Sequence, residues 1–128
     1  GFDDYAPLHM ACEHGRAACT RLLLAAKAEI NAGDSDGRTP LLVACIDGQA
    51  ACARLLLDGG ADVDQQDHSG HTPLFCACRN DHEHCAQLLL EAGADATLRA
   101  TGGDNEGKTA LEIAETCGKA EVAALLRE

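Results

Sequence analysis

The sequence contains very few aromatic residues, and this scarcity argues against a β-sandwich. Aromatic residues make up 2% of the 128 residues, and there is no Trp. The hydrophobic residues, 46% of the chain, are mainly Ala, Leu, Val and Cys. Strands of a sandwich favour aromatic and β-branched side chains, whereas small and unbranched aliphatic side chains suit closely packed helices. We therefore predict an all-α domain that is long enough to have a core of its own.

Positive charge is also scarce, which narrows the choice of partners. Ten Lys and Arg stand against 21 Asp and Glu, giving a net charge of −11. Nucleic acids and anionic membranes both require clustered basic residues, so we expect neither as a partner. No apolar run approaches the ~20 residues of a membrane-spanning helix. A neutral or basic protein or peptide would be attracted to this chain, although the charge could also serve solubility alone.

The chain aligns with itself at an offset of 33 residues. A fourth, shorter copy follows at an offset of 37, after four extra residues between Leu98 and Gly107. The matching positions are Pro7, Pro40 and Pro73; Leu8, Leu41 and Leu74; Ala11, Ala44 and Ala77; and the Leu triplets that begin at Leu22, Leu55 and Leu88. Such a period predicts a solenoid in which each unit buries its apolar face against its neighbours.

Each copy carries the signals of two short helices. In Thr39-Pro40 and Thr72-Pro73 an N-capping hydroxyl precedes a Pro at the first helical position, and we expect a helix over Leu41–Ile46 in the second copy. Each first helix should be followed by a residue in the left-handed backbone conformation, and each Leu-rich second helix should end at another such residue. The residues at these helix-ending positions are Gly15, Gly48, Asp81 and Gly118 after the first helices, and Lys27, Gly60 and Gly93 after the second helices.

These features together resemble the ankyrin repeat. Thr-Pro-Leu, an Ala, a Gly, the Leu triplet and Gly-Ala-Asp recur in register over essentially the whole chain. The resemblance implies an all-α solenoid of helix-turn-helix units with projecting β-hairpin-like turns. It also implies a monomeric binding scaffold with no catalytic residues and no cofactor. We predict a single domain over 1–128, with three full repeats at approximately 1–33, 34–66 and 67–103 and a capping repeat at 104–128.

The two ends of the predicted stack differ in polarity. The last helix, expected over Ala120–Glu128, places charged residues among its apolar positions, as a capping repeat requires. The amino-terminal copy shows no comparable polar face, so we expect the chain to be a fragment of a longer protein with further repeats before Phe2.

In ankyrin-like stacks, partners usually contact the tips of the projecting turns and the exposed face of each first helix. These positions vary between copies while the framework repeats, although plain surface variation would give the same pattern. The positions are Phe2, Asp3, Tyr5, Glu13, His14, Ser35, Asp36, Arg38, Ile46, Asp47, His68, Ser69, His71, Arg79, Asn80, Asn105, Glu106 and Lys108.

The eight Cys residues follow the repeat rather than a disulfide pattern. Two repeat positions hold six of them: Cys12, Cys45 and Cys78, and Cys19, Cys52 and Cys85. Equivalent positions in neighbouring units lie roughly 8–10 Å apart, beyond the ~7 Å limit of a disulfide, although spacing leaves a bridge within one repeat, such as Cys12 with Cys19, open. We therefore expect small buried hydrophobic residues and a reducing compartment, the cytoplasm or nucleus. A zinc or redox module built on Cys76, Cys78, His82, His84 and Cys85 is an alternative.

Two other functions stay open from resemblance. The repeated Ala-Cys with a later Cys, at Ala11-Cys12 with Cys19 and at Ala44-Cys45 with Cys52, is similar to the repeats of ankyrin proteins that recruit substrates to ubiquitin ligases, although a ligase-docking box is absent from these 128 residues. Separately, Leu23 followed eight residues later by Asn31 resembles the site that an iron- and 2-oxoglutarate-dependent asparaginyl hydroxylase modifies. Asn31 could equally be a favourable turn residue and no more.

The hydroxylation hypothesis makes a direct prediction. Incubation with such a hydroxylase should add one oxygen to the peptide that contains Asn31, as measured by mass spectrometry. A peptide of unchanged mass would refute the hypothesis.

Overall fold

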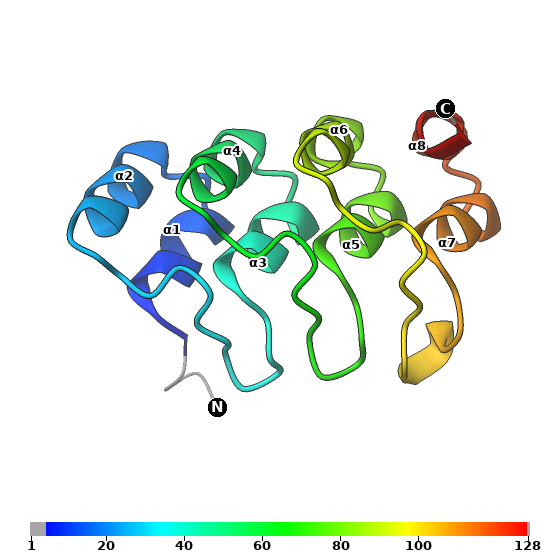
Figure 1. Cartoon of the computed structure of the whole chain (residues 1–128), viewed down its shortest axis with the longest axis horizontal. Helices are drawn as coiled ribbons and strands as arrows, with labels where there is room; N and C mark the ends of the chain where they lie inside the picture. Colours follow the sequence, from blue (N-terminus) through cyan, green and yellow to red (C-terminus); the bar gives the residue numbers. More distant parts are fainter. Residues whose placement is uncertain (1–4, 128) are drawn as a thin grey trace.

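Eight short helices in four consecutive pairs make up the described part of the chain, residues 5–127 of this computed structural model (Figure 1). No strand occurs within these residues, and a 3₁₀ turn, η2 (Gly103–Asn105), lies between the third and fourth pairs. The pairs are α1 (Pro7–Glu13) and α2 (Ala17–Ala25), α3 (Pro40–Ile46) and α4 (Ala50–Asp58), α5 (Pro73–Arg79) and α6 (Glu83–Glu91), and α7 (Ala110–Thr116) and α8 (Ala120–Arg127). The all-α prediction is confirmed.

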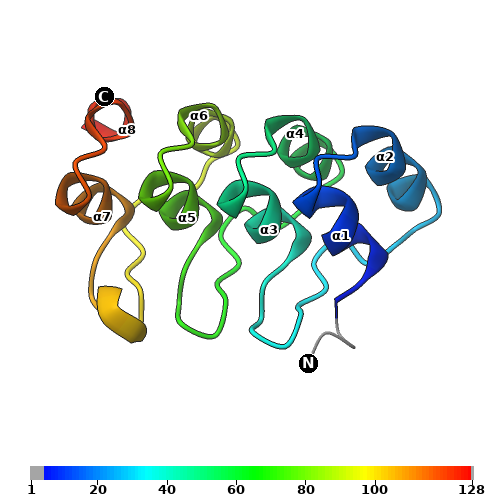
Figure 2. The same ribbon diagram turned by 180° about the vertical axis from the view of Figure 1, so that it is seen from behind.

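The helices form two layers, and long turns project from one side of them. In Figure 1 the second helices of the pairs form the upper layer and the first helices form the layer below. The turns extend downward beyond the first helices, and Figure 2 shows the same order from behind. We call these turns the first finger (31–39), the second finger (64–72) and the third finger (97–109). Each first helix packs on the next first helix, and each second helix on the next second helix.

Small side chains occupy the positions where neighbouring helix pairs meet. Ala44, Cys45, Ala77 and Cys78 are completely buried on α3 and α5. Small residues at these places let the helix axes approach closely, and buried Leu side chains then fill the space between the layers. This arrangement explains why the hydrophobic residues are chiefly Ala, Cys and Leu.

Side-chain caps start the helices where the sequence predicts them. The Thr39 hydroxyl accepts a hydrogen bond from the Leu42 N–H at 3.2 Å, and the Thr72 hydroxyl accepts one from the Phe75 N–H at 3.1 Å. Thr109 begins α7 in the same way, with Glu112 bonding back to its N–H. Each cap satisfies an N–H group that a helix start would otherwise leave without a partner.

The residues that end the helices adopt the left-handed backbone conformation predicted for them. Lys27 has a φ of 67° and Asp81 a φ of 61°, the positive values that Gly adopts at the matching positions of the other copies. Asp tolerates this region better than Lys, because its short polar side chain can bond locally. Strain is therefore expected mainly at Lys27.

One cysteine prediction is wrong. Cys19 is exposed, whereas Cys52 and Cys85, its counterparts in the next two copies, are at most 1% exposed. The reason is that nothing in the described chain packs on the outer side of the first helix pair. All eight cysteines are free, and burial raises the pKa of the Cys12 and Cys78 thiols to about 12, so both thiols remain neutral in the fold.

Replacing Lys27 with Gly should stabilise the protein by about 1 kcal/mol, because Gly adopts a positive φ without a Cβ clash. Chemical denaturation would measure the gain. Asp81→Gly is the matched control and should gain less. An equal or larger gain at Asp81, or a loss at Lys27, would contradict the assignment of strain.

Candidate functional site

Five residues predicted to contact a partner surround one hollow of about 350 Å³ between the first two repeats. The hollow lies beside α1 and α3, which are neighbours in Figure 2, and beside the returning arm of the first finger. The predicted residues around it are Tyr5, Glu13, Arg38, Ile46 and Asp47, and Val43 completes the lining.

Tyr5 is held against the rim of this hollow by two neighbours. Its hydroxyl donates a hydrogen bond to the Glu13 carboxylate at 2.7 Å, and its ring stacks on His9 with centroids 5.0 Å apart. His9 is fully buried, with Nδ1 accepting from the Ala6 N–H and Nε2 bonded to the Arg38 carbonyl at 2.8 Å. Burial, followed by the bond to Glu13, raises the pKa of Tyr5, so its hydroxyl stays a neutral donor. This side of the hollow is therefore rigid.

The Asp34 carboxylate, which sequence reasoning overlooked, organises the first finger. Its Oδ1 accepts from the N–H groups of Asp36 and Arg38, each at 2.9 Å, and its Oδ2 accepts from the Arg38 guanidinium at 3.0 Å. Burial opposes ionisation of this carboxyl, but the backbone donors and the guanidinium outweigh it, and the pKa of Asp34 is lowered. In the second finger, Asp67 accepts hydrogen bonds from the N–H groups of Ser69 and His71 in the same way. The recurrence of Asp after 33 residues was the sequence signal that could have revealed this role.

Charge is unevenly distributed around the hollow. Arg38 also pairs with Asp36 at 3.3 Å, so its positive charge is already balanced within the finger. Within residues 5–127, neither Glu13 nor Asp47 forms an ion pair. Partial burial, together with the nearby Glu13 carboxylate, raises the pKa of Asp47. The hollow thus combines apolar lining from Val43 and Ile46 with two carboxylates that form no ion pair within residues 5–127.

Several predicted contacts of the third repeat are engaged inside the fold. The His71 ring stacks on Phe75 with centroids 4.8 Å apart, and the Arg79 guanidinium lies 5.9 Å from the centre of the same ring. The Asn80 amide donates to the Ile46 carbonyl at 3.2 Å. These three side chains, like Tyr5 and Arg38 of the hollow, already have partners within the fold.

The remaining predicted residues lie along the fingers or apart from the hollow. The fingers are bonded to one another, because the His68 N–H donates to the Asp36 carbonyl and the Thr101 N–H to the Ser69 carbonyl, each at 2.9 Å. His14 caps the end of α1 and lines a different groove. Ser35 is at the first fingertip, Asn105, Glu106 and Lys108 belong to the third finger, and Phe2 and Asp3 lie outside the described residues.

Asn31 has a structural contact that the sequence did not reveal. Its side-chain oxygen accepts a hydrogen bond from the Asp62 N–H of the following repeat at 2.9 Å. Asp64, one period later, accepts one from the Asp95 N–H at the same distance. An exposed side chain at this position thus links neighbouring repeats.

The residues of the zinc alternative do not converge. Among residues 5–127, no three His, Cys, Asp or Glu side chains come together in a way that could hold a metal ion. Cys76 and Cys78 are buried between helices, His84 is exposed, and the His82 ring bonds the Ile46 carbonyl at 3.0 Å.

A paired-helix stack with projecting fingers is the architecture of a repeat scaffold. The family model for ankyrin repeats, described as three copies, matches residues 2–67 and 59–128, and the chain belongs to the ankyrin repeat family. No curated protein matches the chain significantly. Within the described residues, no helix is both long and apolar enough to cross a membrane.

Replacing Asp34 with Ala should lower the free energy of unfolding by about 2 kcal/mol, because three donors lose a buried charged acceptor. The difference in free energy of unfolding between wild type and variant should be largest above pH 3.8, the ordinary pKa of Asp. It should decrease at lower pH, as Asp34 in the folded protein becomes protonated. Urea unfolding over pH 3 to 7 would measure it. Asp36→Ala, the exposed control, should cost under about 1 kcal/mol; a loss equal to that of Asp34→Ala would contradict the account.

Proposed function

We propose that this chain is a non-catalytic protein-interaction module that binds a basic segment of a partner protein at the hollow between the first two repeats. The observation that carries the proposal is the pair of carboxylates, Glu13 and Asp47, which lie beside apolar lining and have no ion pair within residues 5–127. A partner cation would supply the charge that the fold does not.

The chemistry of the hollow suits a Lys or Arg side chain. The methylene groups of such a side chain bury well against apolar residues such as Val43 and Ile46, while its charged end stays near carboxylates. A cation near Asp47 would also relieve the repulsion from Glu13 that contributes to its raised pKa. Tyr5, locked at the rim, adds a rigid aromatic surface of the kind that is enriched in binding hot spots.

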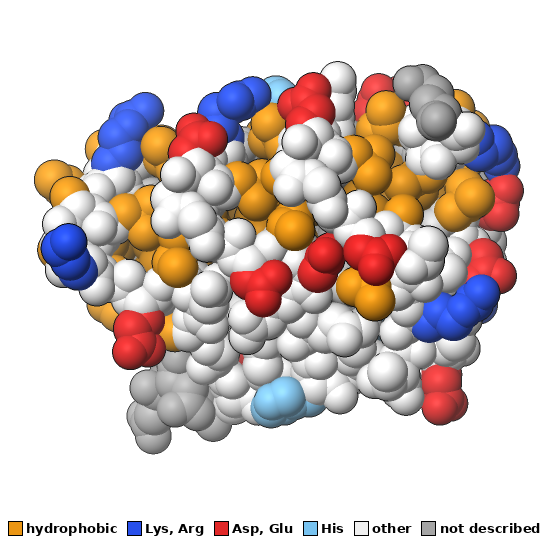
Figure 3. All heavy atoms as spheres, in the orientation of Figure 1, with side chains coloured by type: hydrophobic (Ala, Val, Ile, Leu, Met, Phe, Trp, Pro, Cys, Tyr) orange, Lys and Arg blue, Asp and Glu red, His pale blue; other side chains and the backbone are white. Residues whose placement is uncertain are grey.

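The overall charge supports the same class of partner. At −11 the chain attracts basic partners over a long range, and the attraction weakens as salt screens it. Figure 3 shows acidic side chains spread over one face, with the basic side chains towards its upper and side edges. The predicted fingertip residues would extend the contact beyond the hollow. Eight unpaired thiols support the cytoplasm or nucleus as the place of binding.

Selection of displayed random peptides on the immobilised chain tests this function. We expect the selected peptides to be rich in Lys and Arg next to aliphatic residues, and to bind less tightly as salt increases. Neutralising the two carboxylates with Glu13→Gln and Asp47→Asn should weaken a selected peptide about tenfold, because a charge-assisted contact becomes a neutral one.

The matched control is the double variant Asp58→Asn and Glu91→Gln. It removes the same charge at the exposed ends of α4 and α6, outside the hollow. It should reduce affinity only slightly. Equal weakening by both double variants would show that net charge alone attracts the peptides, and selected peptides without basic residues would contradict the proposal.

A further inference from the structure

A histidine of the third repeat packs against the turn that follows α3. The His82 side chain folds back from the start of α6, and its Nε2 lies 3.0 Å from the Ile46 carbonyl oxygen. A Cβ at Gly48 would lie 2.6 Å from Nδ1 of the same ring. The ring therefore contacts the chain on both sides of Asp47, which is one of the two carboxylates of the hollow.

The hydrogen bond to Ile46 fixes which nitrogen of the His82 ring gains a proton. A carbonyl oxygen only accepts hydrogen bonds, so Nε2 carries the hydrogen that it donates. In the neutral ring Nδ1 then has no hydrogen, and it is the atom that binds a proton on acidification. This nitrogen is the one beside Gly48, so the positive charge arises next to Asp47.

The preceding repeat makes the same contact with a side chain that does not titrate. Gln49 stands one period before His82, and its Nε2 donates a hydrogen bond to the Glu13 carbonyl at 3.0 Å. Its side chain likewise packs against Gly15. A Gln therefore supports this turn as an imidazole does, and the proton-binding nitrogen of His82 is additional to its structural role.

The charge of the Asp47 carboxyl depends on groups from four parts of the chain. Partial burial and the Glu13 carboxylate raise the pKa of Asp47. Three basic groups lower it, in the order His82, His14 and Arg38. Arg38 is charged at every relevant pH and is already ion-paired within the first finger. The two imidazoles are thus the basic groups whose charge changes near neutral pH.

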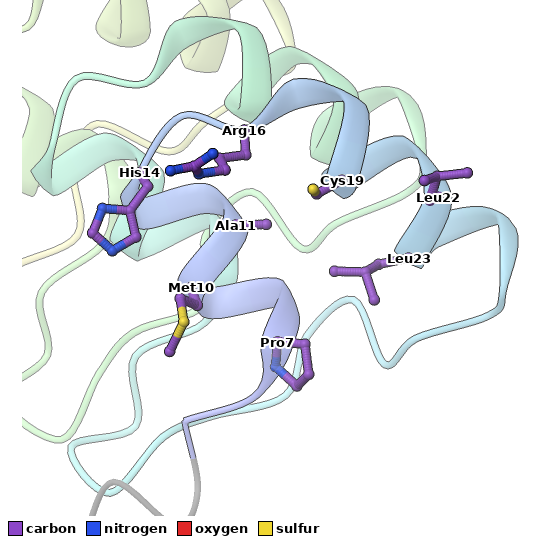
Figure 4. A pocket seen from close by; sticks show the side chains of 8 residues that line it. All are labelled: Pro7, Met10, Ala11, His14, Arg16, Cys19, Leu22 and Leu23. Atoms are coloured by element: carbon purple, nitrogen blue, oxygen red, sulfur yellow. The ribbon is translucent and has the colours of Figure 1, made fainter.

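His14 is the less firmly placed of the two imidazoles. It is exposed at the end of α1, and Figure 4 shows its ring apart from Leu22 and Leu23, with which it lines a groove on the outer side of the first helix pair. Water and salt screen the charge of an exposed ring. His82 is half-buried and held by its bond to Ile46, so its charge acts from a fixed position.

The other charged groups near His82 are carboxylates. Asp81 and Glu83 flank it in the sequence, and both are exposed. A hydrogen bond with Glu121 of α8 raises the pKa of Glu83. All three carboxylates are unchanged in a variant that lacks only the imidazole, so a comparison with such a variant isolates the charge of His82.

We propose that His82 makes the hollow pH-sensitive, weakening its hold on a basic segment when the ring is protonated. The inference rests on the proposed function of the hollow. While the ring is neutral, Glu13 and Asp47 form no ion pair within residues 5–127, and a Lys or Arg of the partner supplies the positive charge. Once protonated, His82 supplies positive charge beside Asp47 and repels the partner's cation. Acidification from pH 7.5 to 5.5 therefore lowers affinity.

Calorimetry with a selected Lys- and Arg-rich peptide that contains no His tests the inference at these two pH values. The wild type should bind about threefold more weakly at pH 5.5, the effect of one charge roughly 7 Å from another in water. His82→Gln keeps a donor for the Ile46 carbonyl, as Gln49 shows one repeat earlier, and should remove most of this loss.

The matched control is His84→Gln, which removes an imidazole from an exposed position of α6 outside the hollow. It should keep the threefold loss. A wild-type affinity that is independent of pH, or a loss that persists in His82→Gln, would overturn the inference. Equal effects of the two substitutions would also overturn it, because they would assign the loss to overall charge.

Titration of the peptide-free chain separates this inference from the proposed function. The Asp47 carboxyl resonance, followed by NMR from pH 3 to 7, should titrate at higher pH in His82→Gln than in the wild type, because a nearby cation is lost. An unchanged titration would overturn the inference even if basic peptides bind. Peptides that bind without dependence on Glu13 and Asp47 would instead refute the proposed function, whereas peptides that depend on both carboxylates but bind equally at both pH values would refute only the role of His82.

Discussion

The packing of each helix pair on its neighbour is the constraint on which the rest of the structure depends. A helix pair of sixteen residues, such as α3 and α4, cannot bury enough apolar surface by itself to offset the entropy of ordering its chain. Stability therefore comes from the repeated interfaces, and these require small side chains such as Ala44 and Cys45 where helices meet. The same requirement explains the low aromatic content and the cysteines at regular spacing, which are buried wherever a preceding repeat covers them.

The repeated framework leaves other positions free to carry chemistry. Tyr5, Arg38, His71 and Lys108 occupy one position in successive copies, yet each makes different contacts. Tyr5 bonds to Glu13, Arg38 pairs with Asp34, and His71 stacks on Phe75. Repetition thus produces a rigid row of sites, and the side chain at each site determines what that part of the surface can bind.

Prediction from the sequence succeeds where a signal is local or periodic. The all-α class, the Thr caps and the left-handed backbone of Lys27 and Asp81 follow from short-range stereochemistry and from register. Five predicted contact residues surround one hollow because the period brings equivalent positions together. Their part in binding stays a prediction.

Contacts that depend on a neighbouring repeat were missed. The hydrogen bond from Asp62 to Asn31 joins residues 31 positions apart, and the exposure of Cys19 depends on what packs on the outer side of the first helix pair. The role of Asp34 depends on how the finger folds around its carboxylate. Neither residue type nor local spacing reports such three-dimensional surroundings.

Native-state hydrogen exchange of the 128-residue chain tests most directly whether stability resides in the interfaces between repeats. Helices packed on both sides, α3 to α6, should exchange most slowly, and α1 and α2, packed on one side only, should open at a lower free energy. Protection of α2 equal to that of α4 would contradict this account, because it would mean that a helix pair does not depend on its neighbours.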